Sequence, residues 1–309
     1  GVRHRVRPGP GAKGRLVNPP PPAPCARFAV APGATPRASI VIPVFNHVEH
    51  TIACLRALAA HPPAAAIEVI VVDDGSSDAT PTLLAQVAGL RYHRRAANGG
   101  FIAACNDGAA LARGEFLVLL NNDTVPQPGW LDALLATFDE HPGVGLVGAQ
   151  LLYPDGRLQE SGGVVFNDGS AANLGRFDAP DDPRFAHLRD VDYVSGAAIA
   201  VPRTLFVELG GFDTRYAPAY YEDTDLAFAI RARGLRTLVQ PAARVVHDEG
   251  TSAGTDTRAG PKAYQVRNRA VFADKWAAAL AGHAAPGTDP LEAADRGAPR
   301  RVLAIDAEP

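Results

Sequence analysis

The sequence predicts an α/β fold built on a mostly parallel central sheet that is flanked by helices. Short β-branched apolar runs recur at residues 39–45, 67–72 and 116–120, and continuous runs of this kind are typical of strands buried on both faces. Helical patterns separate the runs, and carboxylates or amides follow two of them. Strand–helix–strand units with connections of this length indicate right-handed crossovers and therefore a parallel sheet.

The elements of the first half can be assigned in order. A third, shorter strand is predicted at residues 90–93. Pro62 and Pro63 end the first helix, and Asp78 or Ser77 can cap the second. Trp130 is expected in the core. The predicted helices cover residues 49–60, 80–87, 101–112 and 131–140.

The second half has weaker patterns. Residues 150–192 contain scattered glycines and prolines and predict an ordered but loop-rich section. A strand is expected at residues 197–201, a helix at 225–234 and a strand-like run at 244–247. A helical pattern over residues 258–280, which includes Val266, Ala270, Phe272, Ala273 and Trp276, is expected to pack across the sheet.

Composition excludes several classes of protein. The 309 residues are 47% hydrophobic and 20% charged, with a net charge of -3 and a pI near 6.3, so charge gives no case for nucleic acid as a partner. The cysteines Cys25, Cys54 and Cys105 show no CxxC spacing, which argues against disulfides and cysteine zinc sites and favours a reducing compartment. No apolar run has the length of a transmembrane segment or signal peptide.

Both ends of the chain have the composition of linkers. Residues 1–38 are basic and proline-rich, and residues 282–299 return to linker composition. Residues 300–306, RRVLAID, have the pattern of a first buried strand, with a surface-packed tail as the alternative. We therefore expect a folded domain over residues 39–281, and a dispensable segment from 283 to 309 that leads into a further domain of a longer protein.

Polar side chains directly follow the strand at residues 116–120. They are Asn121, Asn122 and Asp123, and ligands of open α/β sheets bind beyond the carboxyl ends of the strands. The carboxylate can hold a divalent cation and the amides can orient a polar ligand. An Asx-rich turn is the alternative reading of the same residues.

A glycine pair precedes the predicted helix at residues 101–112. Asn98, Gly99 and Gly100 allow close backbone approach, and the N–H groups at the helix start could bind a phosphate or a ribose. The spacing matches neither GxGxxG nor the P-loop, which argues against a Rossmann dehydrogenase and a P-loop NTPase.

A set of motifs follows one order along the chain: SIVIPVFN, EVIVVDDGSSD, NGGFIAACNDGAALARGEFLVLLNNDT, SGAAIAV, LGGFDTRY, YYEDTDLAFAIRARG and VVH. In order and spacing the chain resembles family 2 glycosyltransferases with the GT-A fold, in the bacterial branch of rhamnosyltransferase-like and other cell-surface polysaccharide enzymes. The resemblance covers residues 39–276. Such enzymes use a nucleotide-sugar donor and usually a divalent metal, and they invert the anomeric centre by direct displacement. Asn121 departs from the usual DxD motif and leaves fewer carboxylates for a metal.

The resemblance implies a donor side and a metal. Asp123 and His247 are expected to hold Mn²⁺ or Mg²⁺ under the diphosphate of the donor, although a histidine after a strand is often a structural hydrogen-bonder. Asp73 and Asp74 are expected to accept hydrogen bonds from the nucleobase, with a helix cap and turn as the alternative. The other donor-side residues are Pro43, Phe45, Asn98, Gly99, Asn121 and Asn122.

The resemblance also implies an acceptor side. Asp223 is expected to be the general base, with Glu222 orienting the acceptor or the base; a helix cap is the alternative for both. Ser195 and Gly196 match the stretch that lines the acceptor side. Tyr221, like the tyrosine before it, could stack on a sugar face, with hydrophobic packing as the alternative. Acceptor choice would lie in the loop-rich section.

The predicted function is that of a cytoplasmic, inverting, hexosyltransferase-type enzyme of bacterial cell-surface polysaccharide synthesis. The acceptor would be a glycan, a lipid-linked glycan or another hydroxyl compound, with peripheral contact at the inner face of the membrane. A non-catalytic nucleotide- or glycan-binding module is the alternative, supported by Asn121, but Asp123, Asp223 and His247 favour the enzyme. Residues 43–50 lack the glycine-rich basic loop of a sugar-phosphate nucleotidyltransferase.

Overall fold

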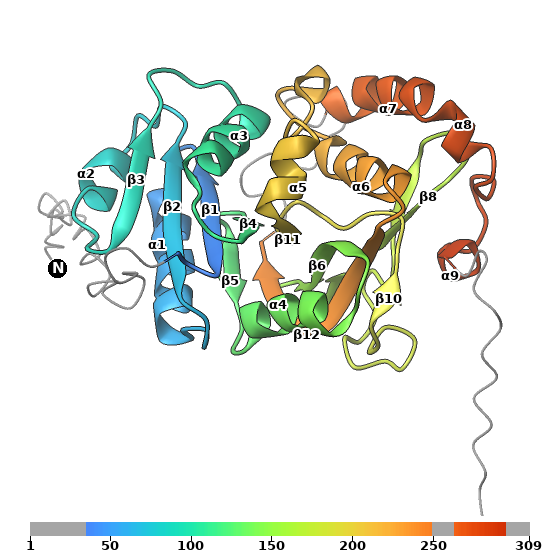
Figure 1. Ribbon diagram of the computed structural model, residues 1–309, viewed down its shortest axis with the longest axis horizontal. Coiled ribbons are helices and arrows are strands. Elements are labelled where there is room, and N and C mark those ends of the chain that lie inside the picture. The colour runs from blue at the N-terminus through green and yellow to red at the C-terminus, as the bar shows by residue number, and fades with distance from the viewer. Residues whose placement is uncertain (1–34, 249–262, 295–309) are drawn as a thin grey trace, which may run out of the picture.

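One sheet forms the centre of the molecule, and a two-stranded ribbon lies beside it (Figure 1). The structure is a computed structural model that describes residues 35–248 and 263–294. The strands of the sheet are β1 (Ala38–Val44), β2 (Ile67–Asp73), β3 (Leu90–Arg94), β4 (Phe116–Leu120), β5 (Thr124–Pro126), β6 (Val144–Leu152), β7 (Leu158–Glu160), β10 (Arg189–Asp190), β11 (Ala198–Pro202) and β12 (Arg236–His247); the ribbon pairs β8 (Gly163–Val165) with β9 (Ala171–Asn173).

The sheet is mostly parallel, as the sequence predicts. Its order is β10–β12–β6–β11–β4–β1–β2–β3, with β5 paired to β12 and β7 to β6. β4, β1, β2 and β3 are mutually parallel, and β6 is parallel to β12. β11 is antiparallel to both of its neighbours, β4 and β6. The turn that precedes β11 therefore lies at the carboxyl end of β4.

Helices cover both faces of the sheet, and two buried clusters separate the sheet from them (Figure 1). Along β1 the side chains alternate: Ile40 and Ile42 belong to one cluster and Val41 to the other, as the two-residue period of a strand requires. One face is covered by α1 (Val48–Ala60), α2 (Thr80–Leu84) and α4 (Trp130–Glu140); the other by α3 (Phe101–Leu111), α5 (Arg203–Glu208), the 3₁₀ turn η2 (Thr214–Tyr216) and α6 (Glu222–Ala232). Outside this second layer lie α7 (Ala263–Lys275) and α8 (Ala277–Leu280), and α9 (Pro290–Ala294) packs on β8.

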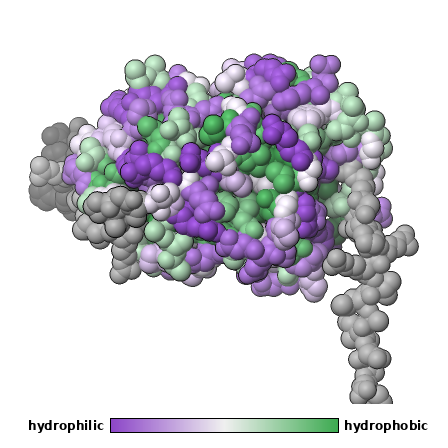
Figure 2. Space-filling view, in the orientation of Figure 1, coloured by the Kyte–Doolittle hydropathy of each residue, from purple (hydrophilic) through white to green (hydrophobic). Residues whose placement is uncertain are grey.

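Most predicted elements of the first half are present, with one shorter than expected. The second helix ends at Leu84 rather than at residue 87, because the amides of Gln86 and Val87 bond to carbonyls only three residues back and tighten the chain into a turn. Trp130 is 1% exposed and lies in the core, as expected. Polar residues cover much of the face in Figure 2, and the apolar residues visible there gather near its centre.

The C-terminal helical pattern packs differently from the prediction. Helix α7 packs on α6 through Phe272, whose ring centroid lies 4.9 Å from that of Phe228. Val266 is 66% exposed, so its assignment to the packing face was wrong. Among the helices within the described ranges, none combines the length and hydrophobicity of a membrane span.

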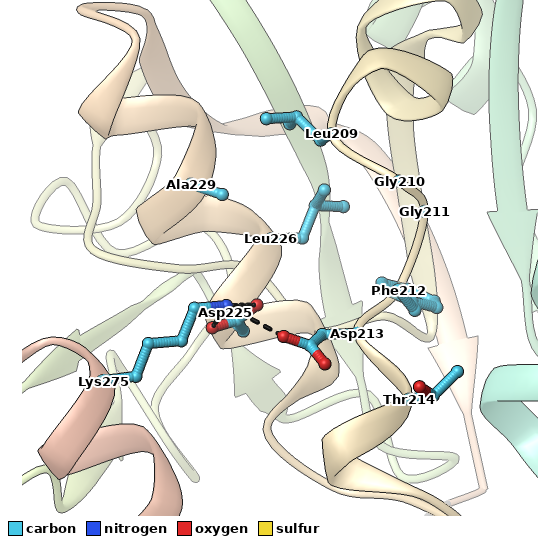
Figure 3. A pocket seen from close by; sticks show the side chains of 10 residues that line it. All are labelled: Leu209, Gly210, Gly211, Phe212, Asp213, Thr214, Asp225, Leu226, Ala229 and Lys275. Carbon is cyan, nitrogen blue, oxygen red and sulfur yellow. Dashed lines mark hydrogen bonds and ion pairs between the residues drawn. The ribbon is translucent and has the colours of Figure 1, made fainter.

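The carboxylate of Asp225 ties α7 to the start of α6. It accepts hydrogen bonds from Tyr216 Oη at 2.9 Å, Trp276 Nε1 at 2.7 Å and Lys275 Nζ at 2.8 Å. Lys275 also donates to Asp213, and these charged groups line a small cavity of about 230 Å³ (Figure 3). Asp225 is therefore occupied by structural contacts between α6, α7 and η2.

We expect Asp225→Ala to destabilise the fold by about 3–5 kcal/mol, because the substitution leaves Lys275, Tyr216 and Trp276 without their shared acceptor in a buried setting. Urea unfolding followed by circular dichroism measures the change. Asp155→Asn, which breaks an exposed pair with Arg157, is the control and should cost less than about 1 kcal/mol. An equally small loss of stability for Asp225→Ala would show that Asp225 does not have this structural role.

Part of the expected C-terminal linker is folded onto the domain. The carbonyl of Ala284 accepts from the amide of Asn167 at 2.9 Å, and His283 Nδ1 lies 2.6 Å from the carbonyl of Val165. Ala293 in α9 is 1% exposed. The linker prediction is therefore wrong for residues up to 294, since small-residue composition did not reveal this packing, and the dispensability of residues 283–309 stays a prediction. Residues 1–34 and 295–309, including the RRVLAID run, lie outside the described residues.

Candidate active site

A cavity of about 580 Å³ lies at the carboxyl ends of β1 and β4. Twelve of the predicted site residues line it, and Asp73, Gly99 and Tyr221 do not. The twelve are Pro43, Phe45, Asp74, Asn98, Asn121, Asn122, Asp123, Ser195, Gly196, Glu222, Asp223 and His247.

The reversed strand β11 explains why distant segments meet here. Its first residue, Ala198, pairs with Leu120, the last residue of β4. The amide of Asn121 then donates to the carbonyl of Ala197 at 2.9 Å. The Ser195–Gly196 turn therefore lies beside the polar residues that follow β4.

Asp74 organises the glycine turn that precedes α3. Its carboxylate accepts from the amides of Gly99 at 2.9 Å and Gly100 at 2.8 Å, and it pairs with Arg95. Gly100 has φ +86°, and a Cβ there would lie 2.7 Å from Pro218 Cβ, so this position requires glycine. The two amides are bound to Asp74, whereas the sequence suggested that they face a phosphate or ribose.

Asp73 is fully buried behind the cavity. Its Oδ1 accepts from the amide of Ser76 at 2.8 Å, and its Oδ2 accepts from the hydroxyl of Tyr92. Asp73 therefore holds the loop after β2, and of the two neighbouring acids only Asp74 reaches the cavity.

The short strand β5 brings the two predicted metal ligands together. Thr124 of β5 pairs with His247 at the end of β12, and the amide of Asp248 donates to the carbonyl of Asp123 at 3.1 Å. His247 Nε2 lies 3.4 Å from Asp123 Oδ1. β5 is a three-residue strand that ends at Pro126, and no sequence pattern predicted it or gave a structural reason for this meeting.

Gln159 orients the imidazole of His247, and the sequence analysis missed it. Gln159 Nε2 donates to the His247 carbonyl at 3.2 Å, so Gln159 Oε1 is the atom that lies 2.8 Å from Nδ1. An oxygen that only accepts requires a hydrogen on Nδ1, so Nε2, which faces Asp123, is the ring nitrogen that can bind a metal. Outer contacts of this kind fix the tautomer of metal-binding histidines.

An irregularity in β7 places two consecutive side chains in the cavity. Leu151 pairs with Glu160 while the next residue, Leu152, pairs with Leu158, so Gln159 is the extra residue of a bulge. Side chains of a regular strand alternate between faces, whereas a bulge redirects one of them. Gln159 and Glu160 both line the cavity as a result. No pattern in the sequence indicates this bulge.

Asp223 and Glu222 lie in the first turn of α6 and face the same cavity. Asp223 Oδ2 accepts from the amide of Gly196 at 2.9 Å, and its Oδ1 accepts from the amide of Thr224 at 2.6 Å. Burial raises the pKa of Asp223, although these hydrogen bonds oppose the rise. Burial, and then the charge of Asp223, raise the pKa of Glu222 well above its usual range.

Tyr220, rather than Tyr221, faces the cavity. Tyr221 is 8% exposed, its hydroxyl donates to the carbonyl of Gly169 at 2.8 Å, and its ring packs 5.3 Å from that of Phe272. The acceptor-side assignment of Tyr221 was therefore wrong, and hydrophobic packing, the alternative, is found. Gly100 of the predicted glycine pair also lines the cavity, and the other lining residues, absent from the prediction, are Val44, Phe101, Ala104, Gln159, Glu160, Asn173, Ala197, Pro218 and Ala219.

The charge of the cavity wall bears on which ligand it accepts. The described lining residues include five carboxylic acids and one histidine, and none is Lys or Arg. A diphosphate would find no protein cation among them. Asp123 and His247 offer the oxygen and nitrogen ligands that suit Mn²⁺, and the oxygen ligand also suits Mg²⁺. The two side chains therefore fit a divalent cation.

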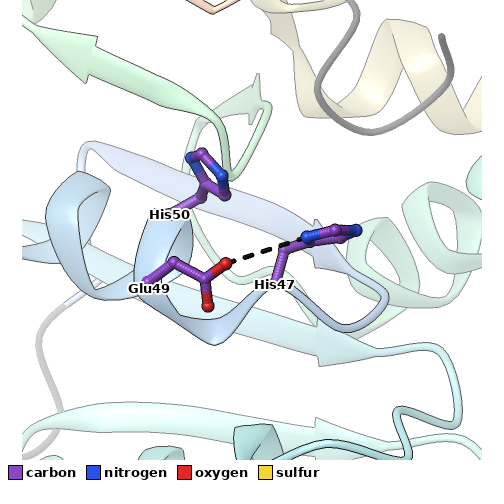
Figure 4. A group of neighbouring side chains, drawn as sticks. All are labelled: His47, Glu49 and His50. Carbon is purple, nitrogen blue, oxygen red and sulfur yellow. Dashed lines mark ion pairs between the residues drawn. The ribbon is translucent and has the colours of Figure 1, made fainter. Parts of the chain in front are cut away.

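A second group of metal-ligand types lies outside this cavity. His47, Glu49 and His50, at the start of α1, have ligand atoms within 4.8 Å of one another (Figure 4). His47 Nδ1 is 3.8 Å from Glu49 Oε1, and both side chains are exposed. None of the three lines the cavity, so this group cannot neutralise a ligand bound there.

Comparisons with known proteins identify relatives over most of the chain. The model of the family described as "Glycosyl transferase family 2" matches residues 39–182. N-acetylglucosaminyl-diphospho-decaprenol L-rhamnosyltransferase of Mycobacterium tuberculosis H37Rv is 30% identical over 262 residues, which cover 76% of this chain and 83% of that protein. The O-antigen biosynthesis protein RfbC of Myxococcus xanthus is 33% identical over 231 residues, which cover 72% of this chain and 18% of that protein.

The fold comparison agrees with the sequence comparison. A crystal structure of GalNAc-T7 with UDP, GalNAc and Mn²⁺ superimposes with a TM-score of 0.57 at 17% identity, covering 70% of this chain and 44% of that chain. At this identity the likeness shows the fold alone. The chain spans a quarter or less of the length of two of the curated relatives that it matches. On the family match and the 30% identity to the mycobacterial enzyme, this chain belongs to glycosyl transferase family 2, and it has the GT-A fold.

Proposed function

We propose that the chain is a metal-dependent, inverting glycosyltransferase that moves a sugar from a nucleoside diphosphate sugar to a hydroxyl of a glycan or lipid-linked glycan. One observation carries the proposal: Asp123, His247 and Asp223 come from distant parts of the sequence and line one cavity. The printed names of the relatives, a rhamnosyltransferase and an O-antigen biosynthesis protein, favour cell-surface polysaccharide synthesis as the setting. A lipid-linked acceptor would place the reaction at the inner face of the membrane.

The donor would lie along the wall that runs from β1 to the end of β4. Phe45 is 49% exposed beside Pro43 and offers an apolar surface to a nucleoside, and Asp74 lies on the same wall. Asn121 and Asn122 can orient the sugar and phosphate oxygens. A divalent cation held by Asp123 and His247 would offset the charge of the diphosphate and stabilise the leaving group.

The acceptor would react at the Asp223 end of the cavity. Asp223 takes the proton of the acceptor hydroxyl as that oxygen bonds to the anomeric carbon of the donor sugar. The bond from this carbon to the diphosphate oxygen breaks on the opposite side, so the configuration inverts and the nucleoside diphosphate leaves. Hydrogen bonds from Gly196 and Thr224 hold Asp223 in place, and burial keeps its carboxylate more basic than that of an exposed aspartate.

A transfer assay tests the proposed function. The purified chain is mixed with UDP-, GDP- or dTDP-sugars, Mn²⁺ and a panel of neutral glycosides, and released nucleoside diphosphate is measured. We expect release with one class of donor, dependent on both Mn²⁺ and the glycoside. A donor that binds tightly but releases no nucleotide with any glycoside would instead favour a non-catalytic binding module.

A further inference from the structure

Two consecutive backbone amides hold two carboxylates at the acceptor end of the cavity. The amide of Ser195 donates to Glu160 Oε1 at 2.8 Å, and the amide of Gly196 donates to Asp223 Oδ2 at 2.9 Å. Glu160 comes from β7 and Asp223 from α6. Because consecutive Cα atoms are about 3.8 Å apart, the turn places two carboxylates from different elements at neighbouring positions on the cavity wall.

A third acid at this end has unused hydrogen-bonding capacity. Glu222 is 5% exposed and lines the cavity, and its Oε2 has no hydrogen-bond partner among the described residues. A buried polar atom of this kind usually has a partner. A ligand hydroxyl that enters the cavity can supply the missing partner.

We propose that Glu160, Asp223 and Glu222 form a subsite for an uncharged sugar ring that presents two neighbouring hydroxyls. One hydroxyl reacts at Asp223, and the adjacent one donates a hydrogen bond to Glu160. This inference rests on the proposed function and names the acceptor class at the same site. Glu160 is then an acceptor-binding residue that selects the hydroxyl to be glycosylated.

Charge sets the second part of this selectivity. A phosphate or a sugar carboxylate in the subsite would lie against the carboxylates of Glu160 and Asp223, and like charges brought close together in a buried setting repel strongly. If the acceptor is lipid-linked, its phosphates must therefore lie outside the subsite, with at least one uncharged sugar between them and the reacting hydroxyl.

Gly196 offers a steric probe of the same place. A Cβ built there would lie 3.5 Å from Asp223 Cβ and 3.6 Å from Asp223 Oδ2, which is ordinary contact, and the residue does not have a positive φ. Gly196→Ala should therefore fold normally and keep the amide that holds Asp223. The added methyl group would occupy space next to the base, where the sugar ring must approach.

Saturation-transfer NMR with simple glycosides tests the subsite in the presence of the bound nucleotide and Mn²⁺. The probes are methyl glucoside, galactoside and rhamnoside, with methyl glucuronide as the anionic comparison. We expect at least one neutral probe to bind the wild-type chain and the glucuronide not to bind. Glu160→Gln and Gly196→Ala should each weaken binding of the neutral probe at least tenfold. Glu160→Gln should also narrow the difference in affinity between the neutral and the anionic probes. Glu208→Gln, which changes an exposed acid outside the cavity, should leave all probes unchanged.

Nucleotide binding, measured on the same samples, separates the two levels of the proposal. If no nucleotide binds with Mn²⁺, the proposed function fails. If nucleotide binds but the glucuronide binds as well as the neutral glycosides, or no neutral glycoside binds, or Glu160→Gln leaves the neutral probe unaffected, the acceptor subsite is overturned and the donor site stands.

Discussion

Asp223→Asn should lower the rate of sugar transfer by about 10²–10⁴-fold while nucleotide binding stays nearly unchanged. Asparagine keeps the shape, and its single carbonyl oxygen can accept from one of the two amides, of Gly196 and Thr224, that hold the native side chain at 2.9 and 2.6 Å. It cannot take a proton from the acceptor. Initial rates of nucleoside diphosphate release, with calorimetry of nucleotide binding alongside, separate the two effects. Turnover close to that of the wild type would leave Asp223 with only the helix-capping role.

The pH dependence of the wild-type enzyme follows from the same residue. A general base works in its deprotonated form, and burial raises the pKa of Asp223 above its usual value of 3.8. The transfer rate should therefore be full at pH values above this raised pKa and fall as the pH drops through it, at a higher pH than for an exposed aspartate. A pH–rate profile that lacks an acid limb would argue against Asp223 as the base.

His247→Ala should abolish the part of nucleotide diphosphate binding that depends on Mn²⁺ and leave the remainder. The imidazole presents Nε2 at 3.4 Å from Asp123 Oδ1, and without it one of the two expected protein ligands is lost. Calorimetric titrations of nucleoside diphosphate in Mn²⁺ and in EDTA measure both parts. His61→Ala, at an exposed position after α1, is the control and should behave as the wild type.

Gln159→Leu should weaken the Mn²⁺-dependent part of nucleotide binding, but less than His247→Ala does. The side chain does not need to touch the cation, but it holds Nδ1 at 2.8 Å and so directs Nε2. Loss of such an outer contact typically costs about 10–100-fold in metal affinity. A Gln159→Leu chain that binds nucleotide in Mn²⁺ as tightly as the wild type would show that His247 keeps its orientation without this contact.

The strands that position the site could be predicted because each has a continuous apolar run that ends in polar residues. Residues 67–72 and 116–120 are read correctly in this way, and the acids and amides after them were expected at the sheet edge. The prediction is possible because both faces of these strands are buried, and such strands have continuous apolar runs in the sequence. The family's motif order then supplied roles for Asp123, Asp223 and His247.

The contacts that complete the site depend on features that are too short to produce a recognisable sequence pattern. Three-residue strands have no periodicity, yet β5 sets His247 beside Asp123, and the bulge of β7 directs both Gln159 and Glu160 into the cavity. Neighbouring aromatic residues pose a similar problem. Tyr221 has φ +76°, and sequence alone does not tell which of the two tyrosines turns toward the core.

The packing of residues 282–294 could not be predicted for a different reason. Small and polar residues are typical of linkers, but a segment of this composition can pack when it covers a ribbon, as it does here through His283, which contacts Val165 of β8, and Ala284, which contacts Asn167. Tertiary contacts of this kind override local composition.

Calorimetric titration of the wild-type chain with UDP, GDP and dTDP, in Mn²⁺ and in EDTA, tests the metal-held donor site most directly. The described cavity wall has five carboxylic acids and no Lys or Arg, and in the proposed donor site a cation held by Asp123 and His247 offsets the charge of the diphosphate. We expect one nucleotide to bind at least 100-fold more tightly in Mn²⁺ than in EDTA, a difference of about 2.8 kcal/mol. Equal affinity under the two conditions, or no binding of any nucleotide in Mn²⁺, would contradict this donor site.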